Sequence, residues 1–261
     1  MLISIITPVL NGQDTIEDTI KSVLGQSYKE IEYIVIDGGS TDGTVRQVKR
    51  YSNRISKLIS EKDNGIYDAM NKGIRLSSGD IIGILNADDV YANDLVLETV
   101  AKEISKNQVD ACYGDLVYVD KDNTDKVIRY WKSRKYEKGL FKKGWMPPHP
   151  TLFVRKWVYE QHGVFDLTYR FAADYELMLR LLYRCGIRGA YIPELLVKMR
   201  IGGMSNRSVG NLIKKSREDY RAMRANGLRG GLFTLALKNI SKVPQFFRKP
   251  LSKRGMESIV T

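Results

Sequence analysis

The chain has 261 residues, of which 43% are hydrophobic and 28% charged. This composition is typical of a soluble globular protein, and the length suffices for a sizeable core. No run of 18 apolar residues occurs, so we expect no membrane-spanning helix, and we expect no signal peptide because Met1 and Leu2 lead directly into a strand. Cys112 and Cys185 lack metal-ligand spacing, and we expect both to be free, buried thiols.

The net charge of +12 is concentrated near the C-terminus. Residues 1–197 contain as many basic as acidic side chains, whereas residues 198–254 contain 15 basic and two acidic ones. A neutral body followed by a basic segment predicts contact with an anionic surface, such as membrane phospholipid, nucleic acid or a lipid-linked diphosphate.

The first 110 residues alternate predicted strands and helices. A helical pattern at 14–25 lies between strands at 2–7 and 31–37, a β-α-β unit that makes its two strands parallel and adjacent. Further helices are predicted at 43–52, 65–77 and 93–106, and further strands at 56–60 and 81–86. The alternation predicts a mostly parallel sheet with helices on both faces.

The pattern changes from Ala111 onward. Two strand-like runs flank the turn at Asp122 and predict a hairpin. The elements expected in this part are the hairpin strands at 111–119 and 127–131, a loop at 132–148, a strand at 151–154, an amphipathic helix at 174–185, strand-like pieces at 191–192 and 195–197, and a helix at 206–226.

Carboxylates gather where two of the predicted parallel strands end. Asp37 follows the strand at 31–37, and the sequence Asn86-Ala87-Asp88-Asp89 follows the strand at 81–86. Because ligands bind outside the carboxyl ends of strands in open α/β sheets, these side chains should meet in one crevice. Adjacent carboxylates form a hard-oxygen site suited to Mg²⁺ or Mn²⁺ bridging to a diphosphate. The alternative is a plain strand-to-helix turn with Asp as a helix cap.

An ordered set of short motifs makes the chain resemble the family 2 glycosyltransferases with the GT-A fold, which are inverting enzymes that use nucleotide sugars. The motifs are Thr7-Pro8-Val9-Leu10-Asn11, Asp37-Gly38-Gly39-Ser40-Thr41-Asp42-Gly43-Thr44, residues 61–74, Asn86-Ala87-Asp88-Asp89, residues 173–180 and Gly202-Gly203-Met204-Ser205.

The resemblance implies a Rossmann-like, mostly parallel α/β sheet flanked by helices. It divides the chain into a GT-A catalytic domain at 1–205 and a helical basic C-terminal extension at 206–261. Within the domain, residues 1–110 would form the nucleotide-sugar-binding half and residues 111–205 the acceptor-binding half.

The resemblance also assigns candidate site residues. It makes Asp174 the catalytic base, although the position alone also fits a helix N-cap, and Glu176 is the alternative base. Asp88 and Asp89 are the candidate metal ligands. The residues implied in nucleotide-sugar binding are Thr7, Pro8, Asn11, Asp37, Asp63, Asp68, Lys72, Asn86, Ala87 and Asp88.

Two further residues are placed on the acceptor or diphosphate side. His149 lies in a proline-rich loop that enters a strand, although a lone histidine is more often structural. Arg200 precedes the Gly-Gly loop that resembles the family's loop near the diphosphate. Asp68 and Lys72 have an alternative as well, because their i,i+4 spacing fits an ordinary ion pair on a helix surface.

The expected function is transfer of a hexose, with inversion, from a UDP-sugar to a glycan on a lipid carrier, with Mn²⁺ or Mg²⁺ as cofactor. The resemblance and the basic tail suggest bacterial surface polysaccharide biosynthesis (O-antigen, capsule or exopolysaccharide), at the cytoplasmic face of the membrane. Residues 129–145 and 228–251 mix basic and apolar side chains and are candidate membrane contacts; a basic face packed on the same domain is the alternative.

Two other functions stay open at this point. The first is a sugar-nucleotide pyrophosphorylase. Such enzymes usually open with a Gly-rich loop that ends in Arg, whereas residues 7–12 of this chain read Thr-Pro-Val-Leu-Asn-Gly. A basic nucleic-acid-binding module would explain the charge, but no helix-turn-helix, RNA-binding sheet or zinc pattern accompanies it. We therefore expect no nucleic-acid partner.

Overall fold

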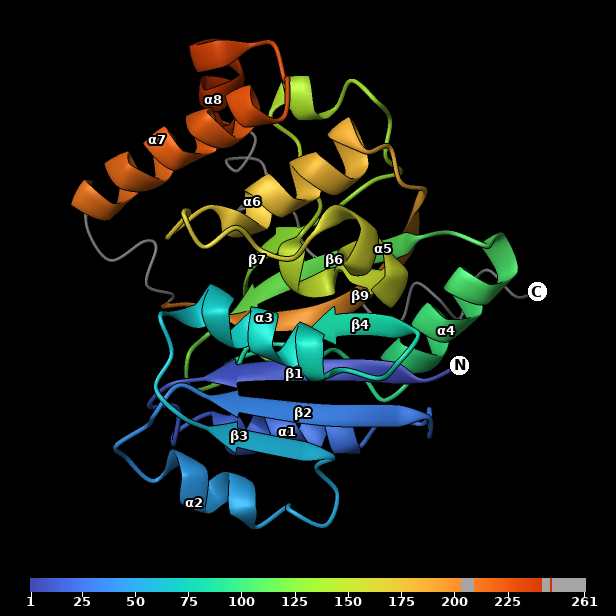
Figure 1. The fold of residues 1–261 in the computed structure, drawn as a ribbon, viewed down its shortest axis with the longest axis vertical. Helices are drawn as coiled ribbons and strands as arrows, with labels where there is room; N and C mark the ends of the chain where they lie inside the picture. The colour runs from blue at the N-terminus through green and yellow to red at the C-terminus, as the bar shows by residue number, and fades with distance from the viewer. Residues whose placement is uncertain (203–208, 241–244, 246–261) are drawn as a thin grey trace.

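A nine-stranded mixed sheet runs through the computed structural model, which describes residues 1–202, 209–240 and 245 (Figure 1). The strand order is β3-β2-β1-β4-β8-β6-β9-β5, and β7 pairs with β6. The strands are β1 (Ile3–Val9), β2 (Ile31–Asp37), β3 (Lys57–Ser60), β4 (Ile81–Ile84), β5 (Val90–Tyr91), β6 (Ala111–Val119), β7 (Val127–Trp131), β8 (Phe153–Arg155) and β9 (Gly189–Arg200).

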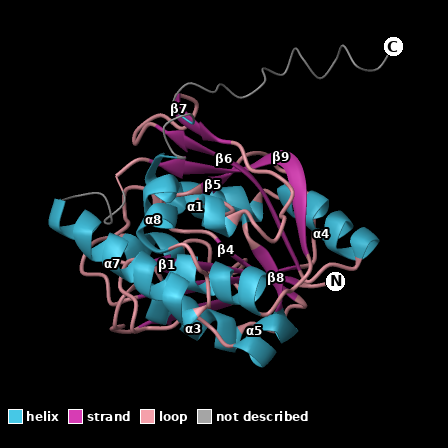
Figure 2. Cartoon of the chain, turned by 90° about the horizontal axis from the view of Figure 1, so that it is seen from above, coloured by secondary structure: helices cyan, strands magenta, loops and turns pink. Residues whose placement is uncertain are grey.

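The N-terminal half forms the parallel part of the sheet, as predicted. β1 pairs in parallel with β2 and with β4, and β2 pairs in parallel with β3. Figure 2 shows α3 and α5 on one side of these strands and α1 and α4 on the other. The helices of this half are α1 (Ile16–Leu24), α2 (Thr44–Lys49), α3 (Ile66–Leu76) and α4 (Val96–Asn107).

In the second half, antiparallel strands flank the parallel pair of β6 and β9. The predicted hairpin of β6 and β7 is confirmed, and β8 pairs antiparallel with both β4 and β6. The two predicted strand-like pieces at 191–192 and 195–197 belong to one strand, β9, whose pairing with β6 shifts register near Pro193. β5 was not predicted, because two residues carry no periodic signal.

The helix predicted at 174–185 is only partly α-helical. α6 (Ala173–Met178) is followed by a π-helical turn, Leu179–Arg184, in which Cys185 N donates to Arg180 O. Cys185 is exposed rather than buried, because it follows the last turn of this segment at the surface, whereas Cys112 is buried in β6 as expected.

α5 (Lys156–His162) and short 3₁₀ turns at Phe141–Lys143 and His149–Thr151 complete this part.

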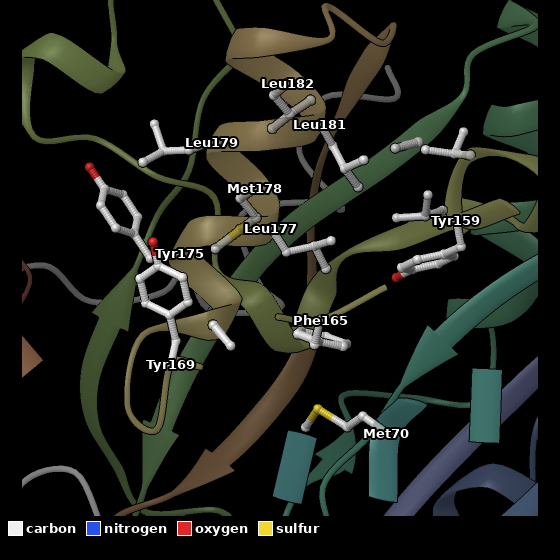
Figure 3. Packing of buried hydrophobic residues seen from close by; sticks show 14 of the residues in the cluster. Met70, Tyr159, Phe165, Tyr169, Tyr175, Leu177, Met178, Leu179, Leu181 and Leu182 are labelled. Carbon is white, nitrogen blue, oxygen red and sulfur yellow. The ribbon is translucent and has the colours of Figure 1, made fainter. Parts of the chain in front are cut away.

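Alternate residues of each buried strand supply two hydrophobic cores, one on each face of the sheet. Ile5 packs with α1 and α4 residues, whereas its neighbour Ile6 packs with residues of α3, α5 and α6. Figure 3 shows part of the second core around Leu177 and Phe165. The sheet is therefore covered on both sides, as its near-continuous apolar strands require.

Two C-terminal helices pack above α6 (Figure 1). α7 (Val209–Ala225) contributes Ala222 and Met223 to the core that contains α6, and α8 (Gly231–Ile240) packs on α7. Among the residues that the structure describes, no helix is both long and apolar enough to cross a bilayer. The domain boundary at residue 205 stays a prediction, and residues 206–208, 241–244 and 246–261 of the predicted extension lie outside the described part.

Close packing of α3 on β1 depends on Gly73. A Cβ atom at this position would lie 2.3 Å from Ile6 Cγ2 in the buried core. We predict that Gly73→Ala destabilises the protein by about 1–3 kcal/mol, although Ala is otherwise the better helix former. Chemical denaturation measures this difference. Gly139→Ala is the matched control, because nothing lies within 4 Å of its added Cβ, and equal stability of the two variants contradicts the prediction.

Candidate active site

The carboxyl ends of β1, β2 and β4 meet at one edge of the sheet, where their loops are cross-linked. Asn11 N donates to Ser40 Oγ (2.8 Å), and Asn11 Oδ1 accepts from Thr41 N (2.9 Å). Asn11 holds a left-handed conformation (φ 51°), which asparagine tolerates better than most residues. Asn11 thus ties the loop after β1 to the loop after β2.

Asp37 shapes the loop that follows β2. Its buried carboxylate accepts hydrogen bonds from Ser60 Oγ (2.7 Å) and from the backbone N–H groups of Gly39 and Ser40 (both 3.2 Å to Oδ2). These bonds fix the turn between β2 and α2 and link it to the end of β3. A contact between Asp37 and a nucleoside stays a prediction.

Thr7 and Pro8 lie inside β1 rather than in the loop after it. Both are buried, and Thr7 Oγ1 accepts from Tyr33 OH at 3.1 Å. Because β1 continues to Val9, neither residue terminates the strand. A contact of Thr7 and Pro8 with the nucleotide sugar stays a prediction.

The segment after β4 contains oxygen atoms that lack partners in the described structure. Asp89 is fully buried, and its Oδ2 accepts from Asn86 Nδ2 at 3.1 Å. In residues 1–202, 209–240 and 245, Asp89 Oδ1 and Asn86 Oδ1 are buried and have no hydrogen-bond partner. Asp88, beyond Ala87, is only half-buried. These are hard oxygens of the kind that divalent cations prefer.

Burial dominates the electrostatics of this pair. It raises the pKa of Asp89 well above its usual range, with a smaller contribution from the neighbouring charge of Asp88, and it raises the pKa of Asp88 as well. A cation at this place would favour the ionised forms of both carboxyls. No three acidic, histidine or cysteine side chains of the described residues cluster closely enough to hold a metal alone. Further oxygens from a ligand would be needed.

Arg200 holds the segment after β4 in place through its backbone. Its guanidinium is 6% exposed and donates to Asp88 O (2.8 Å), to Lys121 O (3.0 Å) and to the carboxylate of Asp18 (2.6 Å). Arg200 therefore fixes the Asp88 backbone to α1, and a direct diphosphate contact stays a prediction. Most of the predicted loop 202–205 lies outside the described residues, beginning at Gly203.

The motif at 61–74 forms the entry into α3. Asp63 Oδ1 accepts from Gly65 N (2.9 Å), and buried Asp68 accepts from Asn64 N (3.0 Å). Lys72 Nζ lies 2.9 Å from Glu61 and 3.9 Å from Asp68, so the i,i+4 ion pair exists. Contact of these residues with a nucleotide stays a prediction.

A pocket of about 90 Å³ joins the end of β4 to α6. Asn86, His149 and Asp174 line it together, so the candidate base lies beside the candidate donor site. Figure 3 shows the apolar side of this region, where Leu177 and Met178 project from α6. The remaining lining residues are Ile66, Tyr67, Met70, Ile84, Pro150, Leu152, Tyr159, Phe165, Leu177 and Met178.

Asp174 has two polar neighbours in this pocket. His149 Nδ1 lies 3.3 Å from Oδ2, and Tyr67 OH donates to Oδ1 at 3.4 Å. Burial opposes the charge of Asp174, but the positive charges of His149, Lys215 and Lys238 outweigh it and lower the pKa. Burial lowers the pKa of His149. The pKa of Asp174 is thus lowered despite its burial, and His149 Nδ1 lies within reach of its Oδ2.

Glu176, the alternative base, is engaged elsewhere. Its carboxylate accepts from Arg180 Nε and Nη2 (both 3.0 Å) and from Asn226 Nδ2 (3.3 Å), and it does not line the pocket. The geometry thus favours Asp174 over Glu176 as a proton acceptor.

Sequence reasoning missed Glu218, which supports the segment that presents Asp174. The Glu218 carboxylate, on α7, accepts from the backbone N–H groups of Arg170 (3.0 Å), Phe171 (2.7 Å) and Ala172 (3.0 Å). Tyr67 was also missed, although it directly precedes the candidate Asp68 in the recognised motif at 61–74. No local pattern links Glu218 to a loop more than 40 residues earlier.

Comparison with known proteins gives one family. Residues 4–161 match the model described as Glycosyl transferase family 2. A PGL/p-HBAD biosynthesis glycosyltransferase of Mycobacterium bovis is 28% identical over 78% of this chain and 79% of the relative. An uncharacterized glycosyltransferase of Haemophilus influenzae is 31% identical over 80% of this chain and 68% of the relative.

Solved structures share the fold. TarS of S. aureus (residues 1–349), in complex with UDP-GlcNAc, has a TM-score of 0.67 at 18% identity and covers 93% of this chain and 67% of that one. The mannosyltransferase PcManGT of Pyrobaculum calidifontis, in complex with GDP-Man and Mn²⁺, has a TM-score of 0.61 at 18% identity, covering 98% and 78%. The GT-A fold expected from the motifs is confirmed.

We predict that Glu218→Ala frees the segment before α6. Three backbone N–H groups lose their acceptor, which should destabilise the protein by about 1–3 kcal/mol. Hydrogen exchange of the Arg170, Phe171 and Ala172 amides should accelerate more than exchange elsewhere. Glu160→Ala, at an exposed glutamate on α5, is the control. Unchanged exchange of those three amides in Glu218→Ala contradicts the assigned role.

Proposed function

Because the chain belongs to glycosyl transferase family 2, we propose that it transfers a sugar from a UDP-sugar to a hydroxyl of a glycan acceptor, with inversion. The observation that carries this proposal is the shared pocket, in which Asp174 faces the segment containing Asn86. The UDP-GlcNAc complex of the structurally similar TarS supports a UDP-sugar as donor. The family match favours this activity over the pyrophosphorylase and nucleic-acid alternatives.

Asp174 acts as general base in this proposal. An ionised Asp174 takes the proton of the acceptor hydroxyl while the hydroxyl oxygen attacks the anomeric carbon. The bond from that carbon to the diphosphate oxygen breaks on the opposite face, and the nucleoside diphosphate leaves. One displacement inverts the anomeric centre, so an α-linked donor gives a β-linked product. His149 and Tyr67 orient the Asp174 carboxylate through their contacts with its two oxygens.

The oxygens of Asn86, Asp88 and Asp89 fit a divalent cation, Mn²⁺ or Mg²⁺. When bound there, the ion would supply positive charge against the leaving diphosphate. The half-buried Asp88 is the better placed ligand, because the Asp89 side chain is fully enclosed. Arg200 keeps the Asp88 backbone in position. The Mn²⁺ complex of PcManGT supports a cation in a related fold.

We further propose a lipid-linked acceptor in bacterial surface polysaccharide assembly, at the cytoplasmic face of the membrane. The excess of basic residues after position 197 supports this location, because lipid-linked intermediates lie in an anionic surface. Apolar side chains around Asp174 support an acceptor with an apolar portion.

We predict that Asp174→Asn lowers kcat by about 10²–10⁴-fold while the affinity for a nucleoside diphosphate stays nearly unchanged. Glu176→Gln should retain far more turnover per folded molecule, since Glu176 is paired with Arg180. Product analysis by NMR should show the inverted anomer. An active Asp174→Asn with a dead Glu176→Gln, or a retained product, refutes this mechanism.

We also predict that a chelator abolishes turnover and that Mn²⁺ or Mg²⁺ restores it. Asp88→Asn should raise the metal concentration for half-maximal activity by at least about 10-fold. Asp94→Asn, an exposed carboxylate beyond β5, is the matched control and should behave like the unmodified protein. Full turnover in excess chelator would exclude the metal-dependent form of the proposal.

A further inference from the structure

α8 turns its apolar side outward. Leu232, Phe233 and Ile240 are 74%, 71% and 61% exposed, whereas Thr234 and Lys238 are buried. The three exposed residues, with exposed Ala236 between them, recur at the spacing of one helix face. A surface helix of a globular protein normally has the opposite arrangement. This face is therefore suited to a partner that accepts apolar side chains.

Specific contacts on the polar side of α8 fix this orientation. Lys238 Nζ lies 2.7 Å from Asp219 Oδ1 on α7 and 3.3 Å from the centre of the Tyr175 ring on α6. Thr234 Oγ1 donates to Lys142 O at 3.0 Å. If α8 rotated to bury its apolar face, Lys238 would lose Asp219 and Thr234 would lose the Lys142 carbonyl. Breaking the buried Lys238–Asp219 ion pair would leave an uncompensated charge, which is strongly unfavourable. The apolar face is thus held outward by the fold.

The neighbouring α7 presents basic side chains on its exposed surface. Its two acidic residues face inward, where Glu218 binds backbone N–H groups and Asp219 pairs with Lys238. Arg221 also lies 3.8 Å above the Tyr169 ring. The exposed basic residues of α7 recur at helical spacing and are Lys214, Arg217, Arg221 and Arg224.

A hollow of about 260 Å³ lies at the turn between α7 and α8. Arg224 and Arg229 are its charged lining residues, and no acidic residue lines it. In the described part of the chain, neither arginine forms an ion pair with a carboxylate. The apolar residues Leu232 and Phe233 follow this turn directly. The other lining residues are Tyr220, Met223, Gly227, Leu228, Gly230 and Gly231.

We propose that the α7–α8 hairpin, residues 209–240, is a docking surface for an anionic phospholipid bilayer. Arg224 and Arg229 bind a headgroup phosphate in the hollow, while Leu232, Phe233 and Ile240 enter the acyl boundary. Guanidinium groups bind phosphate through paired N–H donors. Helices that lie in a membrane interface likewise have an apolar face beside a basic surface. Adjacent charge and apolar area favour a lipid over a free phosphate or a nucleic acid.

The hairpin is better suited to this role than residues 129–145. The aromatic residues of that segment pack inward: Phe141 is buried, and Tyr136 stacks on Trp145 at 5.9 Å between ring centres. They leave little apolar surface for a bilayer. Because α7 packs on α6, docking through the hairpin also holds Asp174 close to the membrane, which deepens the lipid-linked acceptor of the proposed function.

Sedimentation of the full chain with vesicles tests the docking surface without measuring turnover. We expect binding to phosphatidylcholine vesicles that contain phosphatidylglycerol, little binding to pure phosphatidylcholine, and release at high salt. Leu232→Ser with Phe233→Ser, and separately Arg224→Gln with Arg229→Gln, should each lower the vesicle partition coefficient at least about 10-fold. Sugar transfer to a water-soluble acceptor should be unaffected, so this inference and the proposed function can fail separately.

Two control variants match the change in residue type. Leu167→Ser removes an exposed leucine before α6, and Lys102→Gln with Lys106→Gln removes two exposed charges from α4. Both should bind vesicles like the unmodified chain. Equal binding by the hairpin variants overturns the proposal. The proposal is also overturned if the Arg224→Gln, Arg229→Gln variant still binds vesicles but no longer binds duplex DNA or inorganic phosphate. Circular dichroism confirms that each variant is folded.

Discussion

The parallel pairing of β1 with β2 and β4 is the constraint on which the site depends. Parallel strands place their carboxyl ends at one edge, so the segments around Asn11, Asp37 and Asn86 must meet there whatever their separation in sequence. Side-chain bonds such as Asn11 to Thr41 then fix the loops. The buried guanidinium of Arg200 does the same for the segment after β4.

The C-terminal part of the chain supports the helix that carries Asp174. Glu218 on α7 holds the backbone before Asp174, and Lys238 on α8 lies against Tyr175 in the same helix as Asp174. These contacts make α7 and α8 a support for the helix that carries Asp174 as well as a candidate membrane surface. A change at the hairpin surface that leaves Asp219 and Glu218 in place should not disturb this support.

Local sequence patterns predicted much of the fold, because buried parallel strands and amphipathic helices carry strong periodic signals. β1 to β4, α1 to α4 and the β6–β7 hairpin occur within a few residues of their expected ranges. The failures have local causes. β5 is too short for a period, β9 continues through Pro193, and the π-helical turn after Met178 has the same apolar spacing as an α-helix.

The sequence by itself determined the family, the sheet edge that holds the candidate site and the identity of most candidate residues, because these depend on short motifs and strand direction. Only the tertiary structure shows that Asp174 lies beside His149 in a pocket whereas Glu176 binds Asn226 outside it, because these contacts join residues far apart in the sequence. It also revealed the outward apolar face of α8. That orientation depends on buried Lys238 meeting Asp219 and Tyr175, which no periodicity along the chain encodes.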